Sequence, residues 1–163
     1  MKRLYIVVEG QTEEAFVKNV LAPYLLKSQQ LLCVTPSPIH RGHGGRGGMV
    51  SYETLKKDVR RFLAEGDAPI VSTLIDFFRC PDTPGKEVWS RATSHEQEVS
   101  LREQEIGRDI GSERFIPYIQ LHEFEALLFS SDVAFGKLFT DRQSQELSQI
   151  VEEYPNPEEI NTT

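Results

Sequence analysis

Short apolar runs alternate with amphipathic helical segments along this chain of 163 residues. The first and third runs are continuous and rich in β-branched residues, which is typical of strands buried on both faces. Strands that alternate with helices favour an α/β fold of the Rossmann-like kind, with a mainly parallel sheet of about four strands and helices on both faces. The four strands are predicted over Leu4–Val8, Leu31–Ile39, Ile70–Ile75 and Phe115–Leu121.

The intervals between these runs contain helix start and stop signals. Pro23 is expected to kink or end the first helix, and Pro36 and Pro38 are expected to confine the second strand to an edge of the sheet or to shorten it. We expect one α/β domain over residues 1–140, followed by a C-terminal helix and tail over residues 141–163. Thr12 and Ser51 are predicted to cap two helices, and further helices are predicted to begin at about Ser94, His122 and Arg142.

Composition narrows the class of protein. The net charge of -7 argues against general binding to polyanions, although residues 1–48 carry six Lys and Arg against three acids. Cys33 and Cys80 lack a Cys-x-x-Cys spacing, so reduced, mostly buried thiols are expected, with neither a disulfide nor a zinc site. There is no apolar stretch of membrane-spanning length and no signal-peptide pattern, so we expect a cytoplasmic protein without a membrane partner.

Acidic residues fall where three of the apolar runs stop. Glu9 follows the first run, Asp76 follows the third, and His122, Glu123 and Glu125 follow the fourth. The carboxyl ends of parallel strands share one edge of a sheet, and ligands of open α/β sheets bind outside that edge. Carboxylates that converge beside an imidazole suit a hard divalent cation such as Mg²⁺ or Mn²⁺. The sequence therefore predicts a metal site with Glu9, Asp76, Glu123 and Glu125 as candidate ligands, and Glu9, Asp76 and His122 as candidate catalytic residues.

Each of these positions also has a simpler interpretation. Glu9 alone could be a solvated residue at the start of a helix. Glu13 and Glu14 could be acids of the first helical turn, where the helix dipole stabilises negative charge. The cluster at His122 fits a helix N-terminus in the same way. On a helix, His122 and Glu125 share a face while Glu123 points about 100° away, so the three cannot easily hold one ion.

A glycine-rich segment, His40–Gly48, is the candidate contact to nucleic acid. Arg41 and Arg46 lie within it, and Lys56 and Arg60 follow on the next predicted helix. Arginines and free backbone amides can bind phosphate groups. The segment lacks the Gly-Lys-Ser/Thr ending of a nucleotide-binding loop, and a plain surface loop followed by a solvated basic helix face explains it equally well.

Three sequence strings and the tail resemble a bacterial and archaeal toprim-like family that is described as a domain of unknown function. They are Val8–Val17, Thr73–Phe78, Arg114–Phe129 and Tyr154–Asn161. The resemblance covers nearly the whole chain. It implies a toprim-like fold related to nucleases of the overcoming-lysogenization-defect type, a strand-end glutamate at Glu9 and an acidic metal site that starts at Asp76. It also implies partner ATPases of the ABC type and a link to phage defence.

The chain departs from the wider toprim pattern at one position and from the usual length of the family at its C-terminus. The usual Asp-x-Asp would place an acid at position 78, where this chain has Phe78. Glu123 or Glu125 would then have to supply the second acid of the metal site. Family members continue past Asn161 with a basic, proline-containing stretch, so the resemblance implies a C-terminus shortened by truncation or by natural loss.

Three functions follow as hypotheses. The first is a metal-dependent, nuclease-type enzyme that cleaves phosphodiester bonds in DNA or RNA. The second is a non-catalytic interaction or regulatory module that docks on an ABC-type ATPase, which the missing acid at Phe78 favours. A nucleotide or small-phosphate transferase is the third, although no residue pattern marks a purine pocket.

Overall fold

The computed structural model describes residues 2–28, 31–39, 51–78, 80–121, 129, 135 and 139–154. The chain forms two compact units, Met1–Gln120 and Leu121–Thr163. The sheet lies in the first unit. Because most of residues 121–140 lie outside the described residues, the expected domain boundary after residue 140 stays a prediction.

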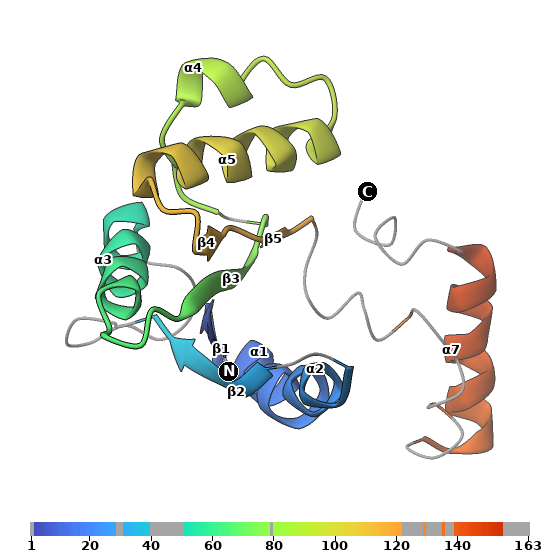
Figure 1. The fold of residues 1–163 in the computed structure, drawn as a ribbon. Helices are drawn as coiled ribbons and strands as arrows, with labels where there is room; N and C mark the ends of the chain where they lie inside the picture. Colours follow the sequence, from blue (N-terminus) through green and yellow to red (C-terminus); the bar gives the residue numbers. More distant parts are fainter. Residues whose placement is uncertain are drawn as a thin grey trace. The chain divides into compact units, whose positions relative to one another are not determined.

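A parallel β-sheet forms the centre of the first unit (Figure 1). The strand order is β2-β1-β3-β4, and β5 also pairs with β3. All four strand pairs are parallel, as the sequence predicted. The proline-containing strand β2 is an edge strand, which confirms its expected place. The bounds are β1 (Lys2–Val8), β2 (Leu31–Pro38), β3 (Ile70–Asp76), β4 (Phe115–Ile116) and β5 (Ile119–Gln120).

Helices cover both faces of this sheet (Figure 1). On one side lie α1 (Gln11–Phe16) and α2 (Ala22–Ser28), and on the other lie α3 (Tyr52–Leu63) and α5 (His95–Ile110). The short helix α4 (Lys86–Trp89) precedes α5. Since β2 lies on one side of β1 and β3 on the other, the strand order reverses between β1 and β3. That position is the topological switch point of the sheet.

Serine caps set the starts of the two long helices. The Ser51 side chain accepts a hydrogen bond from the Thr54 amide at the start of α3, and the Ser94 side chain accepts one from the Gln97 amide at the start of α5. Helix α5 ends at Gly111, whose φ of 68° is in the left-handed region that glycine adopts readily. Both starts lie where the sequence placed them. The predicted cap at Thr12 is wrong, because α1 begins at Gln11, directly after Gly10.

Pro23 changes the winding of the first helical segment without ending it. The helix continues to Ser28, and the turns directly before Pro23 form a π-helix, η1 (Val17–Leu21). Proline has no amide hydrogen and its ring crowds the preceding turn, so a regular α-helical hydrogen bond is lost there. A wider turn at this position accommodates the loss.

The fourth predicted strand, over Phe115–Leu121, was wrong as a single element. It is split into β4 and β5 because Pro117 cannot donate a ladder hydrogen bond. The Thr73 side chain bridges the gap: its Oγ1 donates to the carbonyl oxygen of Tyr118 and accepts from the Tyr118 amide, both at 2.8 Å. The two short strands therefore continue along the same edge of β3.

The central strands are buried between the two helix layers. Val7, Val8 and Val71 are fully enclosed, and Leu55 and Val59 of α3 pack over them on one face. Burying one such side chain contributes about 1.5–3 kcal/mol. This packing fixes the positions at which β1 and β3 end, and those ends carry Glu9 and Asp76.

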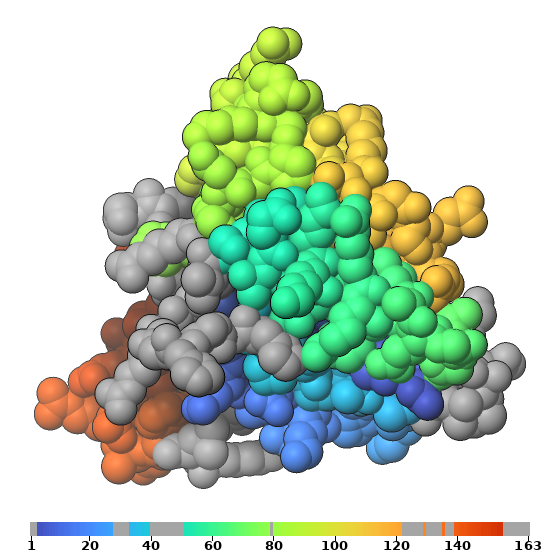
Figure 2. Space-filling view, turned by 90° about the vertical axis from the view of Figure 1, so that its left-hand side faces the viewer, coloured from blue at the N-terminus to red at the C-terminus, as the bar shows by residue number. Residues whose placement is uncertain are grey.

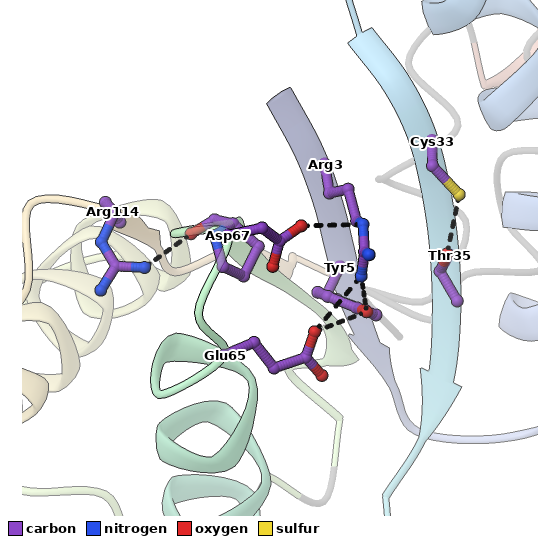
Figure 3. Close-up of polar contacts among 8 residues, drawn as sticks. Arg3, Tyr5, Cys33, Thr35, Glu65, Asp67 and Arg114 are labelled. Atoms are coloured by element: carbon purple, nitrogen blue, oxygen red, sulfur yellow. Dashed lines mark hydrogen bonds and ion pairs between the residues drawn. The ribbon is translucent and has the colours of Figure 1, made fainter. Parts of the chain in front are cut away.

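The amino ends of the strands carry a separate polar network (Figure 3). Arg3 forms an ion pair with Asp67 at 2.8 Å and donates to the Tyr5 hydroxyl at 3.0 Å, and that hydroxyl donates to Glu65 at 2.9 Å. Arg114 donates to the backbone carbonyl oxygens of two residues before β3. The charges at this edge pair with one another, which is typical of a stabilising network.

The second unit contains α7 (Asp141–Glu153), within one residue of the predicted helix. Thr140 and Gln143 form a capping box at its start. Among the described residues, no helix is long and apolar enough to span a membrane.

Candidate functional site

Glu9 and Asp76 meet at the switch point of the sheet. Backbone pairing of β1 with β3 extends to Glu9, whose amide donates to the carbonyl oxygen of Leu74 at 3.3 Å. In a regular parallel ladder the Asp76 amide would next donate to the backbone carbonyl of Glu9. Here it donates to the Glu9 carboxylate, with 3.2 Å between the nitrogen and Oε2. The hydrogen bond places a carboxylate from one strand end directly beside the other acidic residue.

The end of a third strand lies next to Asp76. Gln120 of β5 pairs with Asp76, and its carbonyl oxygen accepts a hydrogen bond from the Phe77 amide at 2.8 Å. The Gln120 side chain is fully buried and accepts a hydrogen bond from the Tyr118 hydroxyl. The carboxyl ends of β1, β3 and β5 are thus adjacent. The sequence-predicted residues His122, Glu123 and Glu125 lie outside the described residues, so their roles stay predictions.

Glu13 is a further acidic residue near this edge. It lies in the first turn of α1 and is only 6% exposed. Its Oε2 lies over Gly10 so closely that a Cβ on Gly10 would be 3.0 Å from it. Within the described ranges, no side chain donates a hydrogen bond to this carboxylate. The interpretation as a dipole-stabilising residue explains its position in the first turn but not its burial. The signal in the sequence is its spacing, four residues after Glu9 across a glycine turn.

Cys80 lies in the segment that leads from Asp76 to α4, and Arg102 of α5 contacts this segment. Burial raises the pKa of the Cys80 thiol to about 11, and the nearby Glu9 carboxylate adds to this rise while Arg102 opposes it. The Cys80 amide donates to the carbonyl oxygen of Phe77 at 3.0 Å, which closes a turn. The Phe77 side chain is half-buried, whereas Phe78 is 54% exposed.

The donor set at this edge fits a hard divalent cation only in part. In the described part of the chain, no three His, Cys, Asp or Glu side chains converge closely enough to hold a metal. Glu9 and Asp76 supply oxygen donors from two strands. Mg²⁺ retains several waters and is commonly bound through one or two carboxylates, so this pair is compatible with it. Position 78, where an acid was expected by resemblance, offers none.

The basic candidates on α3 are partly engaged in contacts within the protein. The Lys56 ammonium group forms an ion pair with Asp109 of α5 at 2.8 Å, and Arg60 donates to the backbone carbonyl of Asp109 at 3.4 Å. Lys56 is half-buried and Arg60 is exposed. Figure 2 shows α3 at the molecular surface with α5 beside it. Arg41 and Arg46 lie outside the described residues, and a nucleic-acid contact by any of the four stays a prediction.

Comparison with known proteins assigns the chain to a family. A family model described as Domain of unknown function (DUF4276) matches residues 8–163. The chain belongs to this family. Neither a curated protein nor a solved structure matches the DUF4276 chain. Membership agrees with the expected domain of unknown function, whereas the relation to toprim domains stays a prediction.

Proposed function

We propose that this DUF4276 domain is a metal-dependent, nuclease-type enzyme that cleaves phosphodiester bonds in nucleic acid. The hydrogen bond between the Asp76 amide and the Glu9 carboxylate carries the proposal. It brings two acidic residues, separated by 67 positions in sequence, to the switch point of a parallel sheet. Ligands of this fold class bind at that position.

The chemistry of the two acids supports a cation as cofactor, Mg²⁺ or Mn²⁺. Glu9 and Asp76 would hold it through carboxylate oxygens, and Glu13 adds a buried carboxylate beside Gly10. A cation bound there would stabilise negative charge on the attacking and leaving oxygens of a phosphodiester. Glu9 is the candidate to accept a proton from the attacking water.

Residues from the sequence analysis complete the proposed site. Glu123 and Glu125 are the proposed source of the acid missing at Phe78, and His122 would orient a ligand or transfer a proton. Arg41, Arg46 and Arg60 are the proposed contacts to the nucleic-acid backbone. Lys56 is less available than Arg60, because Asp109 already pairs with it and Arg60 is more exposed.

The test is cleavage of single- and double-stranded DNA and RNA in the presence of Mg²⁺ or Mn²⁺. In Glu9→Gln the amide oxygen can still accept the Asp76 hydrogen bond, so the fold is retained while the negative charge is lost. We expect Glu9→Gln and Asp76→Asn each to lower the cleavage rate by about 100-fold or more. Asp82→Asn is the matched control. Asp82 also follows β3, but it is exposed and forms an ion pair with Lys86.

Full cleavage activity in both Glu9→Gln and Asp76→Asn would remove the proposal. Glu123→Gln and Glu125→Gln, assayed in parallel, test which of the two acids contributes. Loss of activity in Asp82→Asn as well would point to a general effect of charge on nucleic-acid binding.

A second candidate function is a non-catalytic module that docks on an ABC-type ATPase. The exposed apolar side chains near β4, β5 and the end of β3 favour it, because such groups are common in protein interfaces. They are Phe78, Ile116 and Tyr118. Copurification with an ATPase, together with calorimetry that detects no Mn²⁺ binding, would select this function over catalysis.

A further inference from the structure

Arg102 of α5 is a buried arginine that contacts the segment after β3. Only 6% of it is exposed, and its Nε and one terminal nitrogen bind the Glu98 carboxylate one helical turn earlier, at 2.9 and 2.7 Å. A buried guanidinium group is costly unless its donors are paired. The ion pair with Glu98 satisfies one side of the group and leaves its other donors for partners outside α5.

Those partners all belong to the segment that follows Asp76. Arg102 NH1 donates to the carbonyl oxygen of Pro81 at 3.2 Å. The guanidinium carbon lies 3.7 Å from the centroid of the Trp89 ring and 5.6 Å from that of Phe77. Arg102 also lies near the Cys80 thiol, where its charge lowers the pKa of that group. Several residues of the segment after β3 therefore contact the single side chain of Arg102.

We infer that Arg102 is a positioning residue, which holds the segment after β3 so that Asp76 stays beside Glu9. This inference rests on the proposed function for its consequence in metal binding. Phe77 is the residue next to Asp76, and it contacts Arg102 through its ring and Gln120 through its amide. Fixing Phe77 from both sides restricts the backbone at Asp76.

The planar guanidinium group is essential to this arrangement. It stacks on aromatic rings and donates in several fixed directions, whereas a lysine ammonium is a compact point charge. Trp89, the ring under Arg102, is itself tied to the segment, because its indole nitrogen donates to the carbonyl oxygen of Pro84 at 3.1 Å. A lysine at position 102 would retain the pairing with Glu98 but would lose most of the contacts to the segment.

The test compares Arg102→Gln and Arg102→Lys with wild type by amide hydrogen exchange of the full chain. The Asp76 amide reports the contact directly because its acceptor is the Glu9 carboxylate. We expect this amide to exchange about tenfold faster or more in Arg102→Gln, with Arg102→Lys in between, while the Val71 amide changes little. Tyr52→Phe is the control: it removes a contact between α3 and α5 without touching the segment.

Titration with Mn²⁺, followed by calorimetry, adds the second readout. The dissociation constant is expected to rise in both Arg102 variants and to stay unchanged in Tyr52→Phe. An Asp76 amide that exchanges at the wild-type rate in folded Arg102→Gln, or in Arg102→Lys if the first variant does not fold, would overturn the inference. If wild type binds no Mn²⁺, the proposed function fails, and the exchange data alone still decide whether Arg102 holds Asp76.

Discussion

The two thiols of the described chain have different surroundings. Cys33 is exposed on the edge strand β2, so the expectation of mostly buried thiols is wrong for this residue. Cys80 is half-buried beside Arg102 and Glu9. Because burial raises the pKa of Cys80 to about 11, few of its thiols are ionised at neutral or mildly basic pH. The thiolate is the reactive form. Chemical reactivity should therefore report the enclosure of the segment after β3.

Alkylation with iodoacetamide at pH 8 tests this difference. We expect Cys33 to be labelled at least about 100-fold faster than Cys80 in the folded protein, and the two to react at similar rates in urea. Mass spectrometry of proteolytic peptides at timed intervals gives both rates. Equal labelling of the two thiols in the folded protein would contradict the enclosure of Cys80, and a Cys33→Ser variant shows whether labelling of one affects the other.

At the scale of elements, α3 and α5 are joined through Asp109. The pKa of Asp109 is lowered because Lys56 and Tyr52 donate hydrogen bonds to its carboxylate. A carboxyl group whose pKa is lower in the folded than in the unfolded state stabilises the fold above its ordinary pKa. That contribution is lost as the pH falls through the folded-state pKa. The link between these helices should thus weaken in acid, below about pH 4.

Urea unfolding of wild type and Asp109→Asn at pH 7 and pH 3 measures the link. At pH 7 we expect the variant to have a free energy of unfolding about 1–2 kcal/mol lower than wild type. The difference should shrink at pH 3. The difference between the free energies of unfolding of the two proteins cancels the contributions of the other carboxyl groups. One of these is Glu103, whose pKa is raised by burial. A difference that is the same at both pH values would show that the charge of Asp109 is unimportant.

Elements with strong local signals were predictable from the sequence. Helix α3 begins after the predicted cap Ser51, and α5 begins within one residue of its predicted start at Ser94. Strands β1 and β3 match continuous apolar runs. The split between β4 and β5 was not predicted, because it depends on the Thr73 side chain, distant in sequence, which replaces ladder bonds around Pro117. Helix α4 has only four residues and depends on Trp89 contacts that no local pattern encodes.

The candidate site, like the fold, was predictable from the sequence only in part. That Glu9 and Asp76 share an edge follows from two parallel strands, and the structure places them a hydrogen bond apart. Periodicity does not give the order of strands in the sheet, so the position of both acids at the switch point required the pairing. The burial of Glu13 and Arg102 likewise depends on tertiary packing.

At the scale of the whole molecule, the division after Gln120 separates the sheet from the rest of the chain. The enclosed residues of the sheet and of the helices that cover it all precede this point, including Val8, Val59, Val71 and Ile106. A fragment that keeps a complete core can fold alone, since burial of apolar surface is the main driving force. We therefore expect residues 1–120 to form a stable domain.

Expression of residues 1–120 and thermal melting followed by circular dichroism test this expectation. The fragment should unfold cooperatively, within about 5 °C of the transition that the full chain shows for its sheet. Val71→Ala in both proteins is the matched control, because loss of a core side chain should lower both transitions by a similar amount. A fragment without a cooperative transition would mean that residues 121–163 complete the core, and that the two units are one folding domain.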